Sequence, residues 1–180
     1  MKVLQAMESS DRNPLEGNVE IKKVLISQET IVRDGSKKMI KKDVIIAIEK
    51  KSSGVARIYS RILSQQSKRE FQKFVKTKIL KDSNTKSCRW CSNNFENLEN
   101  EYYMRSFSYA EKESMPLIKR MKTGIEAWLK GMHGKVQHLQ FYLNEYCYRH
   151  NRHRMKGEIW DDLIVRMMNH KPSPYKNLIA

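Results

Sequence analysis

The apolar run Val44–Ile48 is the feature that most limits how this chain can fold. A continuous run of this length, bounded by turn signals at 34–36 and 52–54, is typical of a strand buried on both faces. Alternating apolar and polar residues predict one strand before it, at about 19–28, and another after it, at about 55–63. Three strands joined by short turns predict an antiparallel meander.

Helical patterns follow the predicted strands. Ser67–Glu70 has the spacing of a capping box, with Ser at the cap and Glu three residues later, and it predicts a helix that ends before Asp82. Pro116 predicts the first turn of a second helix, and further helices are expected at about 137–152 and 157–169. The apolar residues expected to form the core among the last three helices are Met121, Ile125, Trp128, Leu139, Tyr142, Leu143, Trp160 and Ile164.

This order of elements predicts a single α/β domain of the RNase H-like type. Its mixed sheet would hold the three-stranded antiparallel meander plus further strands, followed by a helical C-terminal flank. The 180 residues are enough for one domain with a hydrophobic core. We expect residues 1–18 to lead into the sheet, 19–113 to form the sheet and first helix, and 114–180 to form the helical part.

The charge of the chain indicates a polyanionic partner. Lys and Arg number 35 against 20 Asp and Glu, so the formal net charge is +15. A domain this basic favours nucleic acid, DNA or RNA, as its partner. The alternative for each basic cluster is a solvated helix end or a soluble hairpin. The candidate phosphate-binding residues are Lys37, Lys38, Lys41, Lys42, Arg149, Arg152 and Arg154.

Composition also limits the compartment. No apolar run approaches the roughly 20 residues of a transmembrane helix, and the N-terminus lacks the pattern of a signal peptide. The three cysteines favour the cytoplasm, and no membrane partner is expected. Cys88 and Cys91 have C-x-x-C spacing, but zinc requires four ligands and a redox motif requires a thioredoxin-like context. We therefore interpret them as two ordinary thiols.

Two stretches, Met121–Gly134 and His138–Arg152, carry a resemblance to a known family. They resemble the DDE transposases of bacterial insertion sequences, in the Merlin-related group with an ISXO-like transposase domain. The second stretch is similar to the family pattern HLQ-x-YLNEF-x-[FY]R-x-NR. Residues 2–21 resemble the family more weakly, and the resemblance covers nearly all of the chain. It does not include the family's preceding zinc ribbon, so we expect the chain to begin after that module.

The resemblance implies a site for divalent metal whose ligands are missing here. Enzymes of this type hold Mg²⁺ between carboxylates, because hard cations need oxygen ligands. By resemblance, Lys22 occupies the first ligand position and Gly124 the third, and neither can bind a metal. Asp82 would be the second ligand and the one remaining candidate, although an Asp in such a sequence is also typical of a turn. We expect no cofactor and no bound metal.

The function predicted from these observations is nucleic-acid binding by a transposase-derived protein that does not act as an enzyme. DNA is the favoured partner. One alternative is a structural or interaction subunit that meets other proteins in a larger nucleoprotein assembly. A second is an active transposase with a rearranged metal site, built from Glu20, Asp82 and Glu126.

Overall fold

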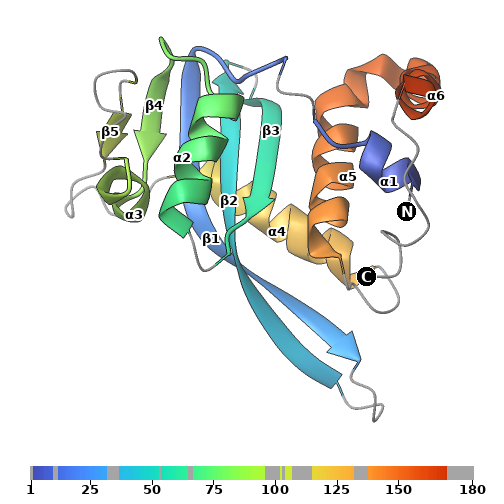
Figure 1. Ribbon diagram of the computed structural model, residues 1–180, viewed down its shortest axis with the longest axis horizontal. Coiled ribbons are helices and arrows are strands. Elements are labelled where there is room, and N and C mark those ends of the chain that lie inside the picture. Colours follow the sequence, from blue (N-terminus) through green and yellow to red (C-terminus); the bar gives the residue numbers. More distant parts are fainter. Residues whose placement is uncertain are drawn as a thin grey trace.

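The computed structural model has a mixed sheet with the strand order β3-β2-β1-β4-β5 and helices on both faces (Figure 1). It describes residues 2–9, 12–31, 37–52, 54–64, 67–95, 102, 104–106, 115–131 and 138–169. The strands are β1 (Asn18–Ile31), β2 (Lys37–Lys51), β3 (Gly54–Ile62), β4 (Asn84–Ser87) and β5 (Met104–Ser106). β1, β2 and β3 pair antiparallel, whereas β4 pairs parallel to both β1 and β5. The predicted α/β class with a mixed sheet is therefore confirmed.

The helices are α1 (Lys2–Ala6), α2 (Ser67–Lys78), α3 (Arg89–Asn93), α4 (Pro116–Lys130), α5 (Leu139–Arg152) and α6 (Ile159–Asn169), with a 3-10 helix at His153–Glu158. Four of the helices, α2, α4, α5 and α6, begin close to where their sequence signals predicted. The capping box at α2 differs from its prediction in one respect. The Glu70 carboxylate accepts hydrogen bonds from the backbone N–H and the hydroxyl of Ser64, at 2.6 and 2.8 Å.

Each face of the sheet carries its own hydrophobic core. Successive side chains of a strand point to opposite faces, so Val19 and Ile21 of β1 pack with α2, whereas Val24 and Ile26 pack with α4 and α5. The predicted doubly buried strand is confirmed, because all five residues of Val44–Ile48 are fully buried. β2 therefore contributes to both cores.

β1 and β2 continue beyond the rest of the sheet as a two-stranded arm (Figure 1). β3 pairs with β2 only from Val44 onward, and β4 pairs with β1 only as far as Ile21. Among the described strands, none pairs with either edge of the outer part of the arm. Lys41 and Lys42, two of the candidate phosphate-binding residues, lie exposed on β2 in this arm.

Side-chain amides of α5 cover the free edge of β3. Asn151 accepts a hydrogen bond from the Ile58 N–H at 2.8 Å and donates one to the Ile58 carbonyl at 2.9 Å. Gln140 likewise accepts from the Ile62 N–H at 2.8 Å and donates to the Ser60 carbonyl at 3.2 Å. An uncovered edge strand would present these groups as a template for another chain. The amides therefore join α5 to the sheet and protect its edge.

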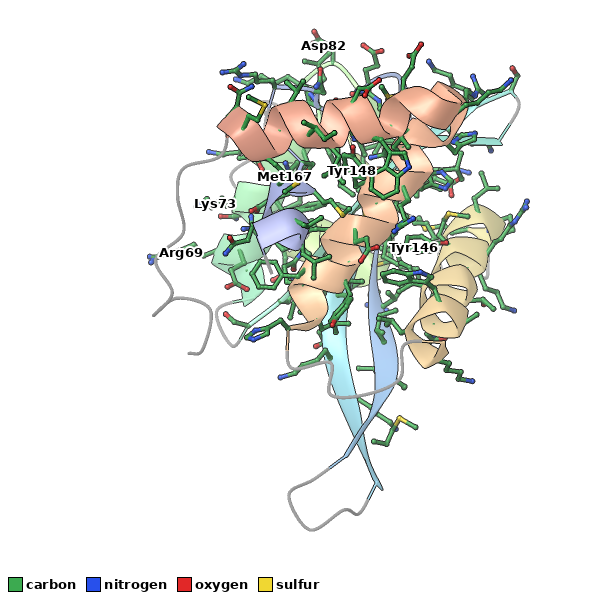
Figure 2. All side chains as sticks on the ribbon, turned by 90° about the vertical axis from the view of Figure 1, so that its right-hand side faces the viewer. Arg69, Lys73, Asp82, Tyr146, Tyr148 and Met167 are labelled. Carbon is green, nitrogen blue, oxygen red and sulfur yellow. The ribbon has the colours of Figure 1, made fainter. Side chains whose placement is uncertain are left out.

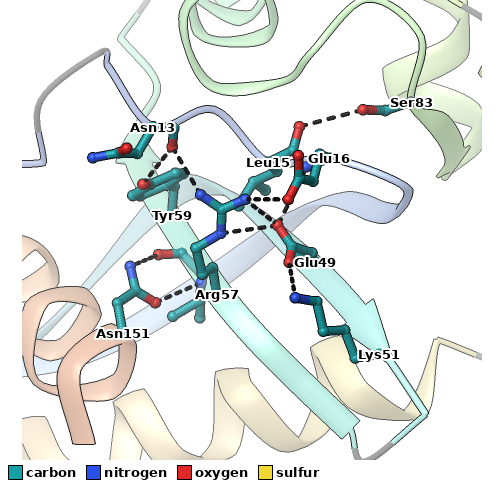
Figure 3. Close-up of polar contacts among 10 residues, drawn as sticks. Asn13, Leu15, Glu16, Glu49, Lys51, Arg57, Tyr59, Ser83 and Asn151 are labelled. Atoms are coloured by element: carbon teal, nitrogen blue, oxygen red, sulfur yellow. Dashed lines mark hydrogen bonds and ion pairs between the residues drawn. The ribbon is translucent and has the colours of Figure 1, made fainter. Parts of the chain in front are cut away.

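A buried ion pair holds the segment that leads into β1 (Figure 3). Glu49 of β2 is 1% exposed, and the Arg57 Nε of β3 donates to its carboxylate at 2.9 Å. The backbone N–H of Glu16 donates to the same carboxylate at 3.2 Å, and the Tyr59 hydroxyl donates to the Asn13 carbonyl at 2.8 Å. A buried carboxylate needs this kind of pairing, because an unpaired buried charge is strongly destabilising.

α6 contradicts the prediction that Trp160 and Ile164 belong to the core. Trp160 is 67% exposed and Ile164 is 52% exposed. The physical reason is that α6 packs on α1 and the end of α5 rather than on the sheet, so only a narrow stripe with Leu163 is buried. The helix was predicted in nearly the right place, but its buried face was wrong.

The role of Asn151 can be measured directly. Asn151→Ala removes both hydrogen bonds to the Ile58 backbone and leaves a donor and an acceptor of the edge strand without a protein partner. We expect the free energy of unfolding in urea to fall by about 1–3 kcal/mol. Trp160→Ala is the control, and as a surface change it should stay within about 0.5 kcal/mol of wild type. Equal losses in the two variants would contradict this assignment.

Candidate functional site

A basic pocket of about 570 Å³ lies between β1 and the first turns of α4. Four lysines line it, two from β1 and two from α4, together with apolar side chains of both elements. Its lining residues are Lys22, Lys23, Val24, Leu25, Met115, Pro116, Ile118, Lys119 and Lys122. Among the described residues that line it there is no carboxylate, so the pocket is suited to anions.

The local structure explains how the lysines meet. Lys22 has the same strand parity as Val24 and Ile26, so it lies on the α4 face of the sheet. Lys119 and Lys122 are three residues apart and therefore share one side of α4. Ile118 and Met121 beside them are buried against the sheet, which holds that side of the helix next to β1.

Lys23 has the opposite parity and is held on the other face. Its Nζ lies 3.3 Å from an Asp43 carboxylate oxygen and 4.5 Å from the centre of the Trp90 ring. On α4, Lys122 lies 3.6 Å from a Glu126 carboxylate oxygen. Neither Asp43 nor Glu126 is among the residues that line the pocket.

The structure does not bring Asp82 to this pocket. Asp82 lies exposed in the turn before β4, at the end of the molecule opposite the arm (Figure 2). β4 enters the sheet with Asn84 beside Asn18 of β1. Asn18 lies four residues before Lys22, which is about 13 Å along the strand. Cys88, which follows β4, lies beside β1 next to Lys22: its backbone N–H donates to the Ile21 carbonyl at 3.3 Å.

Gly124 also lies away from Lys22. A Cβ added at Gly124 would meet the Tyr146 hydroxyl of α5 at 2.5 Å, so this position faces α5. Figure 2 shows Tyr146 on the side of α5 toward α4. Lys122 lies two residues earlier, about 200° around the helix, and it is Lys122 that lines the pocket with Lys22. The sequence analysis therefore did not predict that Lys119 and Lys122 line a pocket with Lys22, or that Cys88 lies beside β1. The three-residue spacing of the two lysines, which puts them on one side of α4, could have indicated the first of these.

The alternative metal set of Glu20, Asp82 and Glu126 is not assembled. Glu126 accepts a hydrogen bond from the Ser27 N–H at 3.4 Å, and Ser27 is seven residues along β1 from Glu20, or about 23 Å. Glu20 is instead buried, 3.9 Å from the Lys50 ammonium, and burial raises the pKa of its carboxyl. Across the described ranges, no group of three or more His, Cys, Asp or Glu side chains is placed to hold a metal.

Two of the three arginines predicted to bind phosphate near the end of α5, Arg149 and Arg152, form ion pairs within the protein. The Arg149 guanidinium pairs with Glu145 at 2.8 Å, and the Arg152 Nε donates to Asp162 at 2.7 Å. Arg152 also lies 4.4 Å from the centre of the Tyr148 ring. Arg154 is exposed, whereas the side chains of Lys37 and Lys38 lie outside the described residues.

The placement of Gly124 against α5 can be tested by a double-mutant cycle. In Gly124→Ala the new Cβ would meet the Tyr146 hydroxyl, so we expect the free energy of unfolding to fall by about 1–3 kcal/mol. In a Tyr146→Phe background the nearest ring carbon is 3.6 Å away. There the higher helix propensity of Ala should stabilise the protein by up to about 1 kcal/mol. Equal effects in both backgrounds would contradict the placement.

No protein-family model and no curated protein sequence matches the chain. Within the part of the chain that the structure describes, no helix combines the length and apolar character needed to cross a membrane. The arrangement of charged side chains at the β1–α4 pocket is accordingly the main basis for inferring what the protein does.

Proposed function

We propose that this protein binds nucleic acid through a basic surface centred on the β1–α4 pocket, using a transposase-derived scaffold without metal-dependent catalysis. The RNase H-like fold expected from the resemblance is supported by the strand order β3-β2-β1-β4-β5, with three antiparallel strands followed by two parallel pairings. Helices on both faces of the sheet are in keeping with the same fold.

The observation that carries this proposal is the gathering of three lysines, Lys22, Lys119 and Lys122, at one pocket on the α4 face of the sheet. A divalent cation would be repelled by Lys22, Lys119 and Lys122, none of which offers an oxygen ligand. A phosphate group would be attracted by the same charges, and each phosphate that is neutralised releases condensed counterions from the nucleic acid. The pocket therefore favours a phosphate backbone over a metal ion.

The arm extends the basic surface. Lys41 and Lys42 are exposed on β2, in the ribbon that also contains the pocket's β1. In the proposed complex, the pocket and the arm contact successive phosphates of one strand. Backbone contacts of this kind fix position without reading sequence. The proposal therefore predicts binding that is salt-sensitive and largely independent of base sequence.

The binding test compares two triple variants that remove the same charge. The first replaces Lys22, Lys119 and Lys122 with Gln in the pocket, and the second replaces Arg69, Lys73 and Lys76 with Gln on α2. α2 packs on the opposite face of the sheet, and Figure 2 labels Arg69 and Lys73. Affinity for duplex DNA and for single-stranded RNA is measured by fluorescence anisotropy across a salt series.

We expect the pocket variant to flatten the slope of log K against log salt by up to about 3, because each duplex phosphate contributes about −0.9. The α2 variant should keep a slope close to that of wild type. Equal flattening in both variants would show that net charge alone governs binding. No affinity of the wild type for DNA or RNA at low salt would overturn the proposal.

Metal-dependent cleavage is tested separately. With Mg²⁺ or Mn²⁺ and supercoiled DNA, we expect no nicking or joining, because lysines occupy the pocket and Asp82 lies at the far end of β4. Gel electrophoresis of the plasmid provides the measurement. Nicking that is lost in Asp82→Ala would contradict the absence of catalysis and favour an active transposase.

One observation favours the second candidate function, an interaction subunit in a nucleoprotein assembly. The outer face of α6 exposes large apolar side chains, with Trp160 at 67% and Met168 at 80%. Exposed apolar side chains gathered on one face are typical of protein contacts. Sedimentation of the protein with and without DNA distinguishes a free binder from an assembling subunit, since only the latter would form larger species that Trp160→Ala disrupts.

A further inference from the structure

Cys88 and Cys91 form a close pair of thiols at the end of β4. Cys88 follows Ser87, the last residue of β4, and Cys91 lies in the short α3 helix. Their Sγ atoms are hydrogen-bonded at 3.3 Å, and both are free thiols. Cys91 is fully buried, whereas Cys88 is only partly buried. One sulfur of the pair is therefore accessible and the other is enclosed behind it.

The surroundings of Cys88 stabilise its thiolate. The side-chain hydrogen bond with Cys91 is the largest cause that lowers the pKa of Cys88, to about 5, and burial acts against it. Backbone N–H groups of Lys23 and Cys91 and the charge of Lys22 lower this pKa further. The Lys23 N–H is available because β4 ends at Ser87, which leaves that position of β1 without a strand partner on this edge.

Cys91 has the opposite character. Burial is the main cause that raises its pKa well above the ordinary value, and the hydrogen bond to Cys88 adds to this. The pair thus combines a partly exposed thiol whose pKa is lowered with a buried thiol whose pKa is raised. The groups with the largest effects on Cys88, besides its burial, are Cys91, the backbone N–H of Lys23 and the charge of Lys22.

We propose that Cys88 and Cys91 form a thiol–disulfide exchange site for low-molecular-weight disulfides, with Cys88 attacking and Cys91 resolving. The inference rests on the geometry of the pair and does not require that the protein bind nucleic acid. It departs from the interpretation of the two residues as ordinary thiols, because the sequence spacing alone could not show that the sulfurs touch or that one is buried.

The proposed reaction has two steps. The Cys88 thiolate attacks one sulfur of a disulfide RSSR, forming a mixed disulfide and releasing RS⁻. Cys91 then gives up its proton to the solvent, and its sulfur attacks Cys88 Sγ, which forms the Cys88–Cys91 disulfide and releases the second RS⁻. The two cysteine sulfurs lose two electrons, which the small disulfide gains as it becomes two thiols after protonation.

The geometry favours this closure. The sulfurs need to approach by only about 1.3 Å to reach the bond length of a disulfide, about 2.0 Å. The third cysteine cannot compete, because Cys147 is buried on the opposite core and lies 3.2 Å from the Ser60 hydroxyl. Lys22 links the pair to the basic pocket, so a disulfide that carries carboxylates is the favoured class of substrate.

Glutathione disulfide is the probe for the test. The folded, reduced protein is incubated with it in graded ratios to glutathione, quenched by alkylation, and digested for mass spectrometry. We expect wild type to yield an intramolecular Cys88–Cys91 disulfide. Cys91→Ser should instead accumulate glutathione on Cys88, because the resolving sulfur is missing. Cys88→Ser should form neither product, and Cys147→Ser should react as wild type.

The pH profile gives a readout that a purely structural pair would not move. At pH values below its pKa of about 8.5, an ordinary thiol is alkylated about tenfold faster for each unit by which the pH rises. A pKa of about 5 implies that Cys88 is ionised at neutral pH, so its alkylation rate should change by less than about twofold between pH 7 and pH 9. A rate that keeps rising through this range, or a Cys91→Ser protein that traps no glutathione, would overturn the proposal. Both outcomes are independent of any measurement of nucleic-acid binding.

Discussion

β1 is hydrogen-bonded along both edges, antiparallel to β2 on one side and parallel to β4 on the other. Its alternating side chains therefore have to satisfy two different cores, with Val19 and Ile21 facing α2 and Val24 and Ile26 facing α4 and α5. A shift of one residue would exchange these two sets between the faces. The register of β1 consequently fixes which face carries Lys22 and which carries Lys23, and with them the character of the pocket.

The residues that carry the resemblance to transposases in α5 have structural roles in this molecule. Gln140 and Asn151 cover the edge of β3, and Arg152 pairs with Asp162 of α6. Asn144 supports this arrangement, because it accepts a hydrogen bond from Gln140 at 2.8 Å. These contacts stabilise the fold whatever the site contains. The polar pattern of α5 is thus explained by sheet protection.

The end of β4 has two chemical properties that share one cause. Because β4 is short, β1 continues past it, and no described strand pairs with that edge of β1 beyond Ile21. Lys22 there contributes to the cationic pocket, while the Lys23 N–H and the Lys22 charge stabilise the Cys88 thiolate. Oxidation of the thiols would remove that negative charge from the neighbourhood of Lys22. The proposed redox chemistry and the proposed binding surface are therefore neighbours in space, though each stands on its own observations.

The sequence by itself determined the local elements and the charge. Continuous apolar character predicted the doubly buried strand Val44–Ile48, and Pro116 predicted the start of α4. These signals are strong because periodicity and helix caps depend on residues close together in the chain. The net charge of +15 is likewise a property of composition alone.

Only the tertiary structure decided which residues meet. Asp82 and Gly124 were grouped with Lys22 by resemblance, but the register of β4 puts Asp82 at the opposite end, and the rotation of α4 turns Gly124 toward Tyr146. The same register and rotation bring Lys119 and Lys122 to Lys22 and place Cys88 beside β1. α6 exposes Trp160 because it docks on α1 rather than on the sheet. Local pattern specifies the faces of an element, whereas contacts between distant segments depend on register and docking, which no short stretch of sequence encodes.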